Sequence, residues 1–388
     1  MAGNSFVIKN CRLFNKPASR QSYNIIIDGS KISAIHLSSS EIDSKTHIDN
    51  VIDAGDRIAA PGLIDIHIQG AGGADILDGT EEAVTAISKT LAHTGTTSFL
   101  GTTVVKPNEG NKHLKSTKEF VGKDLEGAFL LGFHLEGPFI NPVKKGGISP
   151  LAIYDSSTEA LNEIMDITGN TLKVMTIAPE LPGNLNIIKS LKLKGIIPAF
   201  AHSNASYEEI KKGFEAGILH ITHILNAMPG FHHRDATAIN AIFENDKVTA
   251  QIISDGHHLH PSTVKMLYKI LGPERCICIT DGVQGIGLPE GRYFFNGREY
   301  ESRNGAARYL DGTLIGSTTS LLNIVLKFMQ FTACTLEQAI NSASLNPAKL
   351  LGLNKGELEK GKDADIIVLD KDFSVFASII NGKLVYRK

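Results

Sequence analysis

The sequence lacks tryptophan, holds only four cysteines among 388 residues, and carries no large excess of charge of either sign. Its formal net charge of −2 excludes a general basic field that would attract nucleic acid or anionic lipid, so any anion must be bound locally. The cysteines form no C-x-x-C pair, which favours reduced thiols over a disulfide framework or a thiolate metal site.

Long apolar runs are missing as well. The first residues, MAGNSFVIKNCRLFNKPASR, contain no apolar core of the kind found in signal peptides, and no run reaches membrane-spanning length. We therefore expect a cytoplasmic protein with neither a membrane nor a nucleic acid as partner. A chain of this length can bury the core of one large domain together with a small one.

Both ends of the chain are rich in β-branched residues. The segments SFVIKNCRLF and NIIIDGSKISAI come first, with an Asp28-Gly29 turn, and the C-terminal SIINGKLVYRK repeats the style with Asn381-Gly382. Such turns between β-branched runs are typical of hairpins. The pattern predicts a small β-sandwich domain formed jointly by residues 1–58 and 352–388.

The middle of the chain, residues 59–351, alternates between short apolar runs and segments with helical periodicity such as EEAVTAISKTLAHTG, SYEEIKKGFEAG and PSTVKMLYKILG. This alternation predicts an α/β fold, a (β/α)8 TIM-type barrel. Further helices are expected near 318–331 and 335–351, and the glycine-rich NGREYESRNGAARYLDGTLIGS is expected to form a loop or a β-hairpin. The eight runs lie near residues 63–67, 97–101, 129–135, 173–178, 196–201, 218–222, 248–254 and 276–280.

Polar side chains that can bind metals or move protons follow several of these runs. They are His67, Glu136, His202, His223 and Asp281, and the segment SDGHHLH follows the seventh run. Active sites of such barrels form at the carboxyl ends of the strands, so we expect these residues to meet there.

Strand alternation predicts which side chains face inward. If Asp281 faces the barrel interior with Ile279, Cys278 must face the surrounding helices. The same rule places His223 on the face of Ile221 and points His220 outward.

Glu136, His202 and His223 supply two imidazoles and one carboxylate, a ligand set typical of a catalytic divalent metal such as Zn²⁺. Asp281 would then carry a proton between water and a leaving group, or alternatively only cap the turn that follows it. His134 is either a hydrogen-bonding partner of this set or a core histidine. Each histidine taken alone is more often structural than a ligand.

The segment IDIHIQG raises the question of a second metal. His67 and Gln69 lie two residues apart on one strand and should point the same way. An amide oxygen binds zinc far less well than an imidazole, so we expect one tightly held metal per chain and a hydrogen-bonding role for His67.

Seven ordered motifs resemble one enzyme family. The chain is similar along residues 1–388 to the N-acetylglucosamine-6-phosphate deacetylases of the amidohydrolase superfamily. The motifs are APGLIDIHIQG, GFHLEGPFINPVKKG, AHSNAS, THILNAMPGFHHR, SDGHHLH, ITDG and GTLIGS.

The resemblance implies hydrolysis of the sugar's acetamide to acetate and glucosamine-6-phosphate by a homodimer. It implies one divalent ion per chain, Zn²⁺ or alternatively Fe²⁺, Mn²⁺ or Co²⁺, bound by Glu136, His202 and His223, with Asp281 as the proton carrier. The positions implied to contact the substrate are Gly147, Asn226, Ala227, Arg234, His258, Leu314, Ile315 and Gly316.

Two positions depart from the family pattern. Ile148 stands where many members have a histidine, and Asp235-Ala236-Thr237 replaces the usual Glu-Pro-Gly. The alternatives are therefore a deacetylase for N-acetylgalactosamine-6-phosphate or for an unphosphorylated sugar, and a barrel scaffold without catalysis. A two-metal, dihydroorotase-like site is disfavoured because the fourth strand ends VMTIAPE, without a lysine.

Overall fold

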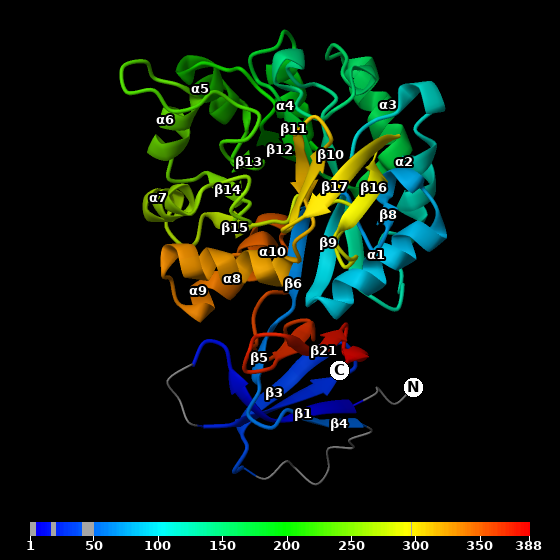
Figure 1. Cartoon of the computed structure of the whole chain (residues 1–388), viewed down its shortest axis with the longest axis vertical. Coiled ribbons are helices and arrows are strands. Elements are labelled where there is room, and N and C mark those ends of the chain that lie inside the picture. Colours follow the sequence, from blue (N-terminus) through cyan, green and yellow to red (C-terminus); the bar gives the residue numbers. More distant parts are fainter. Residues whose placement is uncertain (1–4, 17–20, 41–49, 296) are drawn as a thin grey trace.

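The computed structural model describes residues 5–16, 21–40, 50–295 and 297–388. The chain forms a large α/β barrel above a smaller sheet (Figure 1). The small sheet contains both ends of the described chain, whereas the barrel is built from the residues between them. The exact division at residues 58 and 352 stays a prediction, and residues 1–4, 17–20 and 41–49 of the proposed small domain lie outside the described residues.

The barrel contains eight parallel strands in sequential order, as the alternating apolar runs predict. The first and last strands meet at their carboxyl ends through a bridge between Ile68 and Gly282, and the Gln69 backbone N–H donates to the Gly282 carbonyl at 2.8 Å. The strands are β6 (Leu63–Ile68), β9 (Thr96–Thr103), β10 (Phe129–Glu136), β11 (Leu172–Ile177), β12 (Ile197–Phe200), β13 (His220–Ile221), β14 (Thr249–Ile252) and β15 (Cys276–Cys278).

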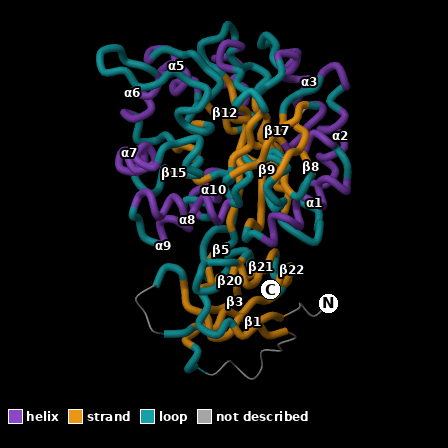
Figure 2. Tube along the Cα trace, viewed as in Figure 1, coloured by secondary structure: helices purple, strands orange, loops and turns teal. Residues whose placement is uncertain are grey.

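Helices follow these strands and cover the outside of the barrel (Figures 1 and 2). The helix predicted from SYEEIKKGFEAG begins after Ser206, whose hydroxyl and whose partner Glu209 form a capping box. The stretch predicted as one helix over 335–351 is instead split in two. The helices are α1 (Glu81–His93), α2 (Lys112–Thr117), α3 (Thr158–Thr168), α4 (Asn184–Leu193), α5 (Tyr207–Ala216), α6 (Ala238–Glu244), α7 (Pro261–Leu271), α8 (Leu321–Thr332), α9 (Leu336–Asn341) and α10 (Leu345–Leu351).

The glycine-rich insertion after the eighth strand is an antiparallel meander rather than a single hairpin. Its strands are β16 (Gly291–Phe295), β17 (Arg298–Arg303), β18 (Ala306–Tyr309) and β19 (Leu314–Ser317). Val283, Phe295, Tyr300, Ala307 and Tyr309 form a separate small core beneath it. A further two-stranded hairpin, β7 (Gly70–Ala71) and β8 (Ala74–Asp75), follows β6.

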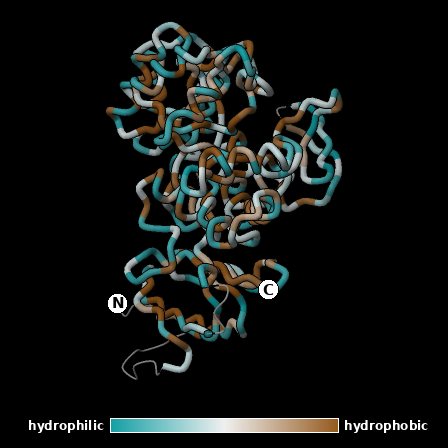
Figure 3. Tube along the Cα trace, turned by 90° about the vertical axis from the view of Figure 1, so that its left-hand side faces the viewer, coloured by the Kyte–Doolittle hydropathy of each residue, from teal (hydrophilic) through white to brown (hydrophobic). Residues whose placement is uncertain are grey.

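The small domain is a mixed sheet in which β1 connects two groups of strands, β2, β3 and β4 on one side and β5, β20, β21 and β22 on the other. Its first residues pair with β2 and β4, and Arg12 and Leu13 pair with β5. Hydrophobic segments, drawn in brown, run through this small domain in the lower part of Figure 3. Both predicted hairpin turns are present, and Asn381 (φ 50°) and Gly382 (φ 75°) have the left-handed backbone of a two-residue turn. The strands are β1 (Ser5–Leu13), β2 (Tyr23–Asp28), β3 (Lys31–Leu37), β4 (Asn50–Asp53), β5 (Ile58–Pro61), β20 (Ile366–Leu369), β21 (Val375–Ile380) and β22 (Lys383–Arg387).

The four cysteines are free, as expected from their spacing. Burial raises the pKa of Cys11 and of Cys278 to about 12, so neither thiol ionises readily near neutral pH. Within the described ranges, no helix combines the length and the apolar character that crossing a bilayer requires.

Candidate metal centre and substrate cavity

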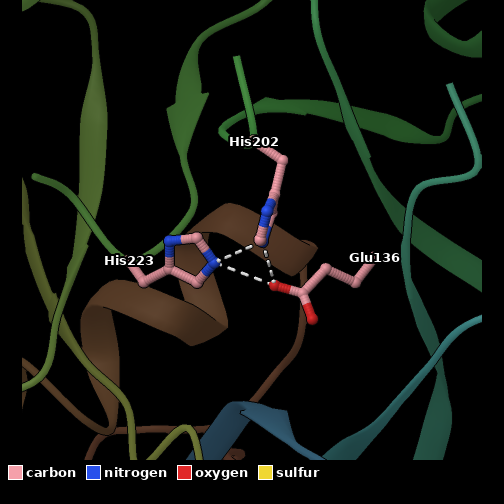
Figure 4. Close-up of side chains that lie close together, drawn as sticks. All are labelled: Glu136, His202 and His223. Carbon is pink, nitrogen blue, oxygen red and sulfur yellow. Dashed lines mark hydrogen bonds and ion pairs between the residues drawn. The ribbon is translucent and has the colours of Figure 1, made fainter. Parts of the chain in front are cut away.

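Glu136, His202 and His223 converge at the carboxyl end of the barrel, as predicted (Figure 4). The Oε1 atom of Glu136 lies 2.9 Å from Nε2 of His202 and 2.8 Å from Nε2 of His223. The two Nε2 atoms are 3.1 Å apart. The three side chains come from the ends of β10, β12 and β13 and are buried, so their polar atoms meet away from bulk water.

Left-handed backbone brings the two histidines together. His202 has φ 47° and His223 has φ 28°, and each lies two residues after the end of its strand. Non-glycine residues adopt such angles only at a cost that surrounding contacts must offset. The side-chain directions therefore cannot be read from strand alternation.

The segment after β12 is held by Glu180, which the sequence analysis did not single out. Its carboxylate accepts hydrogen bonds from the Ser203 hydroxyl (2.7 Å), the Asn204 backbone N–H (2.7 Å) and the Asn141 side chain (2.9 Å). These contacts fix the turn that carries His202. Glu180 ends the segment VMTIAPE of the fourth strand, and a carboxylate at a strand end was the signal by which the sequence could have identified it.

The donor set fits a divalent metal ion. Nδ1 of His202 donates to the Lys144 carbonyl at 2.8 Å, so a neutral His202 ring has its lone pair on Nε2, facing Glu136. Burial opposes charge on Glu136, but the neighbouring His202 and His223 hold its pKa well below the ordinary value. One carboxylate oxygen and two imidazole nitrogens thus point at a common centre, and a cation there would relieve their crowding.

Asp281 lies beside this centre, also with a left-handed backbone (φ 48°). Its Oδ1 atom is 3.3 Å from Nε2 of His67 and accepts a hydrogen bond from the Gln69 amide at 3.4 Å. His67 and Gln69 therefore point the same way, as predicted. Burial works against ionisation, but His258 and His67 lower the pKa of Asp281, which keeps it a carboxylate that can accept a proton.

His258 approaches Asp281 from the segment after β14. Its Nε2 lies 3.5 Å from Oδ2 of Asp281, and its Nδ1 lies 2.6 Å from Oδ2 of the buried Asp255. Burial alone would lower the pKa of His258, but the hydrogen bonds with these two carboxylates raise it to about 9. His258 is therefore a cationic group between two acids.

A cavity of about 530 Å³ opens above these residues, within the size range of small-molecule sites. It is lined by the predicted Glu136, Gly147, His202, His223, Asn226, Ala227, His258, Asp281, Leu314 and Ile315. Ile148 lines it as well, so an apolar side chain does occupy the wall where many family members have histidine.

Two predicted contacts are not among the described residues that line the cavity: Arg234 and Gly316. Arg234 is exposed on the segment before α6, where its guanidinium contacts the neighbouring His233 at 2.8 Å. At Gly316 a Cβ would lie 2.6 Å from the Asp281 carbonyl oxygen. Glycine is needed there so that β19 can pass close to the Asp281 backbone.

The prediction that His220 points outward is wrong. Its ring is fully buried and contacts Gln251, which in turn contacts His67 in the barrel interior. The parallel register places His220 beside Thr249, on the inward face. The prediction assumed that side chains alternate regularly from His220 to His223. The left-handed backbone at His223 breaks this alternation, so the direction of the His223 side chain does not predict that of His220.

His134 is a core histidine rather than a partner of Glu136. Its Nδ1 donates to the Ile66 carbonyl at 3.1 Å, and its Nε2 lies 2.9 Å from the Thr176 hydroxyl. Burial holds its pKa well below the ordinary value, so the ring is neutral. It packs edge-on against His67, with ring centroids 4.7 Å apart.

Comparisons with known proteins agree on one family. The Amidohydrolase family profile matches residues 58–385. An N-acetylglucosamine-6-phosphate deacetylase of Bacillus subtilis (strain 168) is 33% identical over 98% of this chain and 97% of its own. The enzyme of that name from Homo sapiens is 34% identical, over 86% and 85% of the two chains. An N-acetylgalactosamine-6-phosphate deacetylase of Escherichia coli O157:H7 is 32% identical, over 84% and 88%.

Solved structures show the same likeness. The N-acetylglucosamine-6-phosphate deacetylase of Pasteurella multocida superposes with a TM-score of 0.89 at 26% identity, covering 99% of this chain and 100% of its own. A mutant of the Mycobacterium smegmatis enzyme, in complex with N-acetyl-D-glucosamine-6-phosphate, gives a TM-score of 0.86 at 25% identity with the same coverage.

Proposed function

The chain belongs to the amidohydrolase family, among the N-acetylglucosamine-6-phosphate deacetylases, and from this membership we propose that it hydrolyses the acetamide of N-acetylglucosamine-6-phosphate to acetate and glucosamine-6-phosphate. The observation that carries the proposal is the convergence of Glu136, His202 and His223 beside the ionised Asp281, within a cavity large enough for a sugar phosphate.

Glu136, His202 and His223 would hold one divalent ion, which we propose to be Zn²⁺. When bound, such an ion polarises a carbonyl and lowers the pKa of water to roughly 7. Asp281 accepts the proton that water loses and returns it to the nitrogen of the leaving amine. His258 orients the Asp281 carboxylate from 3.5 Å and contributes positive charge close to the reacting amide.

The remaining cavity residues bind and cover the sugar. Asn226 and Ala227 follow His223 and would bind the phosphate, with Arg234 as a further contact. Leu314 and Ile315, from the meander, line the same cavity as Gly147 and would cover the sugar with it. Homodimer formation and a cytoplasmic location stay predictions.

A second candidate, deacetylation of N-acetylgalactosamine-6-phosphate, rests on the E. coli relative and on Ile148, an apolar residue in the cavity wall where many family members have a histidine. Acetate release from both sugar phosphates and from unphosphorylated N-acetylglucosamine separates the candidates. We expect the highest kcat/KM with N-acetylglucosamine-6-phosphate. A higher kcat/KM with N-acetylgalactosamine-6-phosphate would favour the second candidate over the first. Absence of acetate release from all three sugars would contradict both.

Replacing Arg234 with Ala is expected to raise KM for the phosphorylated substrate by about 10- to 100-fold, the value of one hydrogen bond between charged groups. The unphosphorylated sugar should be affected little. Arg292→Ala, which removes another exposed arginine, on β16, is the matched control and should leave both KM values unchanged. Equal effects of Arg234→Ala on both sugars would count against a phosphate contact.

We expect about one tightly held metal per chain, because the Gln69 amide donates to Asp281 and offers no imidazole to a second ion. Elemental analysis after dialysis measures the stoichiometry. Gln69→His should raise it towards two when metal is supplied. Two tightly held ions in the unmodified protein would disprove the single-metal proposal.

A further inference from the structure

The cavity continues past the residues implied to bind a sugar phosphate. Its wall also includes Asp75 and Leu77, from the segment after β6, and residues 102–109, from the end of β9 and the segment that follows it. We call this part of the cavity the second lobe. Gln69, directly after β6, lines the same cavity and its amide donates to Asp281 at 3.4 Å, so the second lobe adjoins the reacting groups.

A close approach across the cavity separates this lobe from the side proposed to bind phosphate. A Cβ placed on Gly147 would lie 3.8 Å from Cγ2 of Ile315. Gly147 follows β10, the third barrel strand, and Ile315 belongs to β19, which follows the eighth. In a ring of eight strands, this contact leaves the segments after the first and second strands on one side and those after the fourth to seventh on the other. The second lobe lies on the first side, whereas Asn226 and Ala227 lie on the second.

The shape of the substrate determines which of its ends reaches the second lobe. The phosphate is carried by C6, which is attached to C5 of the sugar ring, and the acylamino group is carried by C2, opposite C5. A phosphate at Asn226 and Ala227, after the sixth strand, therefore directs the amide across the metal centre towards the second strand, which lies opposite the sixth in the ring. Because a trans amide extends away from the sugar, the acyl chain is the part that continues into the second lobe.

The wall of the second lobe offers apolar contacts beside polar groups that already have partners. Leu77 and Val104 are half-buried, so a hydrocarbon chain that contacts them leaves bulk water. The Lys106 ammonium pairs with Glu109 at 3.0 Å, and Oδ1 of Asp75 accepts a hydrogen bond from the Leu77 N–H at 2.8 Å. An uncharged acyl chain suits this wall, whereas an anionic chain would approach the carboxyl groups of Asp75 and Glu109.

We propose that the second lobe is an acyl-binding site, and that the protein also removes unbranched acyl groups longer than acetyl, such as propionyl and butyryl, from the amino group of the sugar phosphate. The bond that breaks is the same amide C–N bond. One water supplies the second oxygen of the released carboxylate and the proton that the amine takes up. This inference rests on the proposed amide hydrolysis and extends it to a class of N-acyl substrates.

A series of glucosamine-6-phosphates with N-acetyl, N-propionyl, N-butyryl and N-succinyl groups, given to the metal-loaded protein, tests the proposal. All four release glucosamine-6-phosphate, so one assay measures every kcat/KM. N-propionyl and N-butyryl substrates should keep at least about one-tenth of the kcat/KM for N-acetyl, because a site closed behind the acetyl methyl would lose about 10-fold or more for each added CH₂. The N-succinyl substrate, as long as N-butyryl but ionised, should be the poorest of the four.

Variants that fill the lobe locate the acyl chain. Leu77→Trp should lower kcat/KM for N-butyryl by about 10-fold or more through overpacking, and that for N-acetyl by less than about threefold. Val104→Phe narrows the lobe from the segment after β9 and should act in the same way, so it decides if Leu77→Trp does not fold. Leu193→Trp is the matched control and should change neither value, because Leu193 is exposed at the end of α4 and is not among the described residues that line the cavity.

A kcat/KM for N-butyryl below about one-tenth of that for N-acetyl in the unmodified protein would overturn the proposal. Equal losses for both acyl groups in the variants that fill the lobe, or no loss for N-butyryl, would also overturn it. A higher kcat/KM for N-succinyl than for N-butyryl would contradict an apolar acyl site. Each of these results leaves the proposed function standing as long as acetate is released, whereas the absence of product from every substrate would refute both.

Discussion

Asp281→Asn is expected to lower kcat by about 10²- to 10⁴-fold while the fold and the bound metal are retained. Asparagine keeps the shape of the side chain, but its amide cannot accept the proton released by water. Because Asp281 is not one of the three proposed ligands, zinc content should stay close to that of the unmodified protein.

Asp78→Asn provides the control for this substitution, because Asp78 is an exposed carboxylate in the capping box of the short turn after β8 and is not among the described residues that line the cavity. The kcat of the Asp78→Asn variant should equal that of the unmodified protein. KM of the Asp281 variant should change little, because the lost interaction acts in the transition state rather than in binding. Near-normal kcat in Asp281→Asn would refute its role as proton carrier.

Removal of the metal is the second large effect. Dialysis against a chelator should abolish acetate release, and about one equivalent of a divalent ion per chain should restore it, since only Glu136, His202 and His223 form a ligand cluster in the described part of the chain. Restoration by Zn²⁺ at substoichiometric levels should be proportional to the metal added.

Two single substitutions locate that metal. His223→Gln removes one imidazole and should lose both the ion and the activity. His113→Gln alters a buried histidine whose Nε2 contacts the Val104 carbonyl at 3.0 Å, away from the cluster, and should keep the metal. Full metal content in His223→Gln, or activity that persists after complete metal removal, would contradict the proposed centre.

Much of the fold was predictable because strand periodicity is a local property. Each of the eight apolar runs between residues 63 and 280 became a parallel barrel strand, and each predicted hairpin turn formed at its glycine. The split between α9 and α10 was missed although Pro347 marks it: a proline fits only the first turn of a helix, so a new helix has to begin shortly before it.

The candidate metal ligands were predictable from their place at strand ends, but the directions of their side chains were not. His202, His223 and Asp281 all have positive φ, so alternation fails at the very residues that matter. His220 was misplaced for this reason. A polar residue inside a strand, such as Gln251, has no motif that identifies it, and only its contacts with His67 and His223 show that it lies beside the site.

Arg234 shows the limit of a resemblance. Its motif places it eight residues after Asn226, but the segment between β13 and α6 holds it on the surface, outside the cavity wall. Sequence spacing along such a segment does not determine where its side chains point, so its phosphate contact stays a prediction.

The most direct test of the central claim is hydrolysis of N-acetylglucosamine-6-phosphate by the metal-loaded protein in ¹⁸O-enriched water. The amide mechanism predicts ¹⁸O in the released acetate, an equal amount of glucosamine-6-phosphate, and no label in phosphate. Asp281→Asn, run in parallel, should give little acetate in the same time. Labelled inorganic phosphate, or no acetate from the metal-loaded protein, would contradict the account.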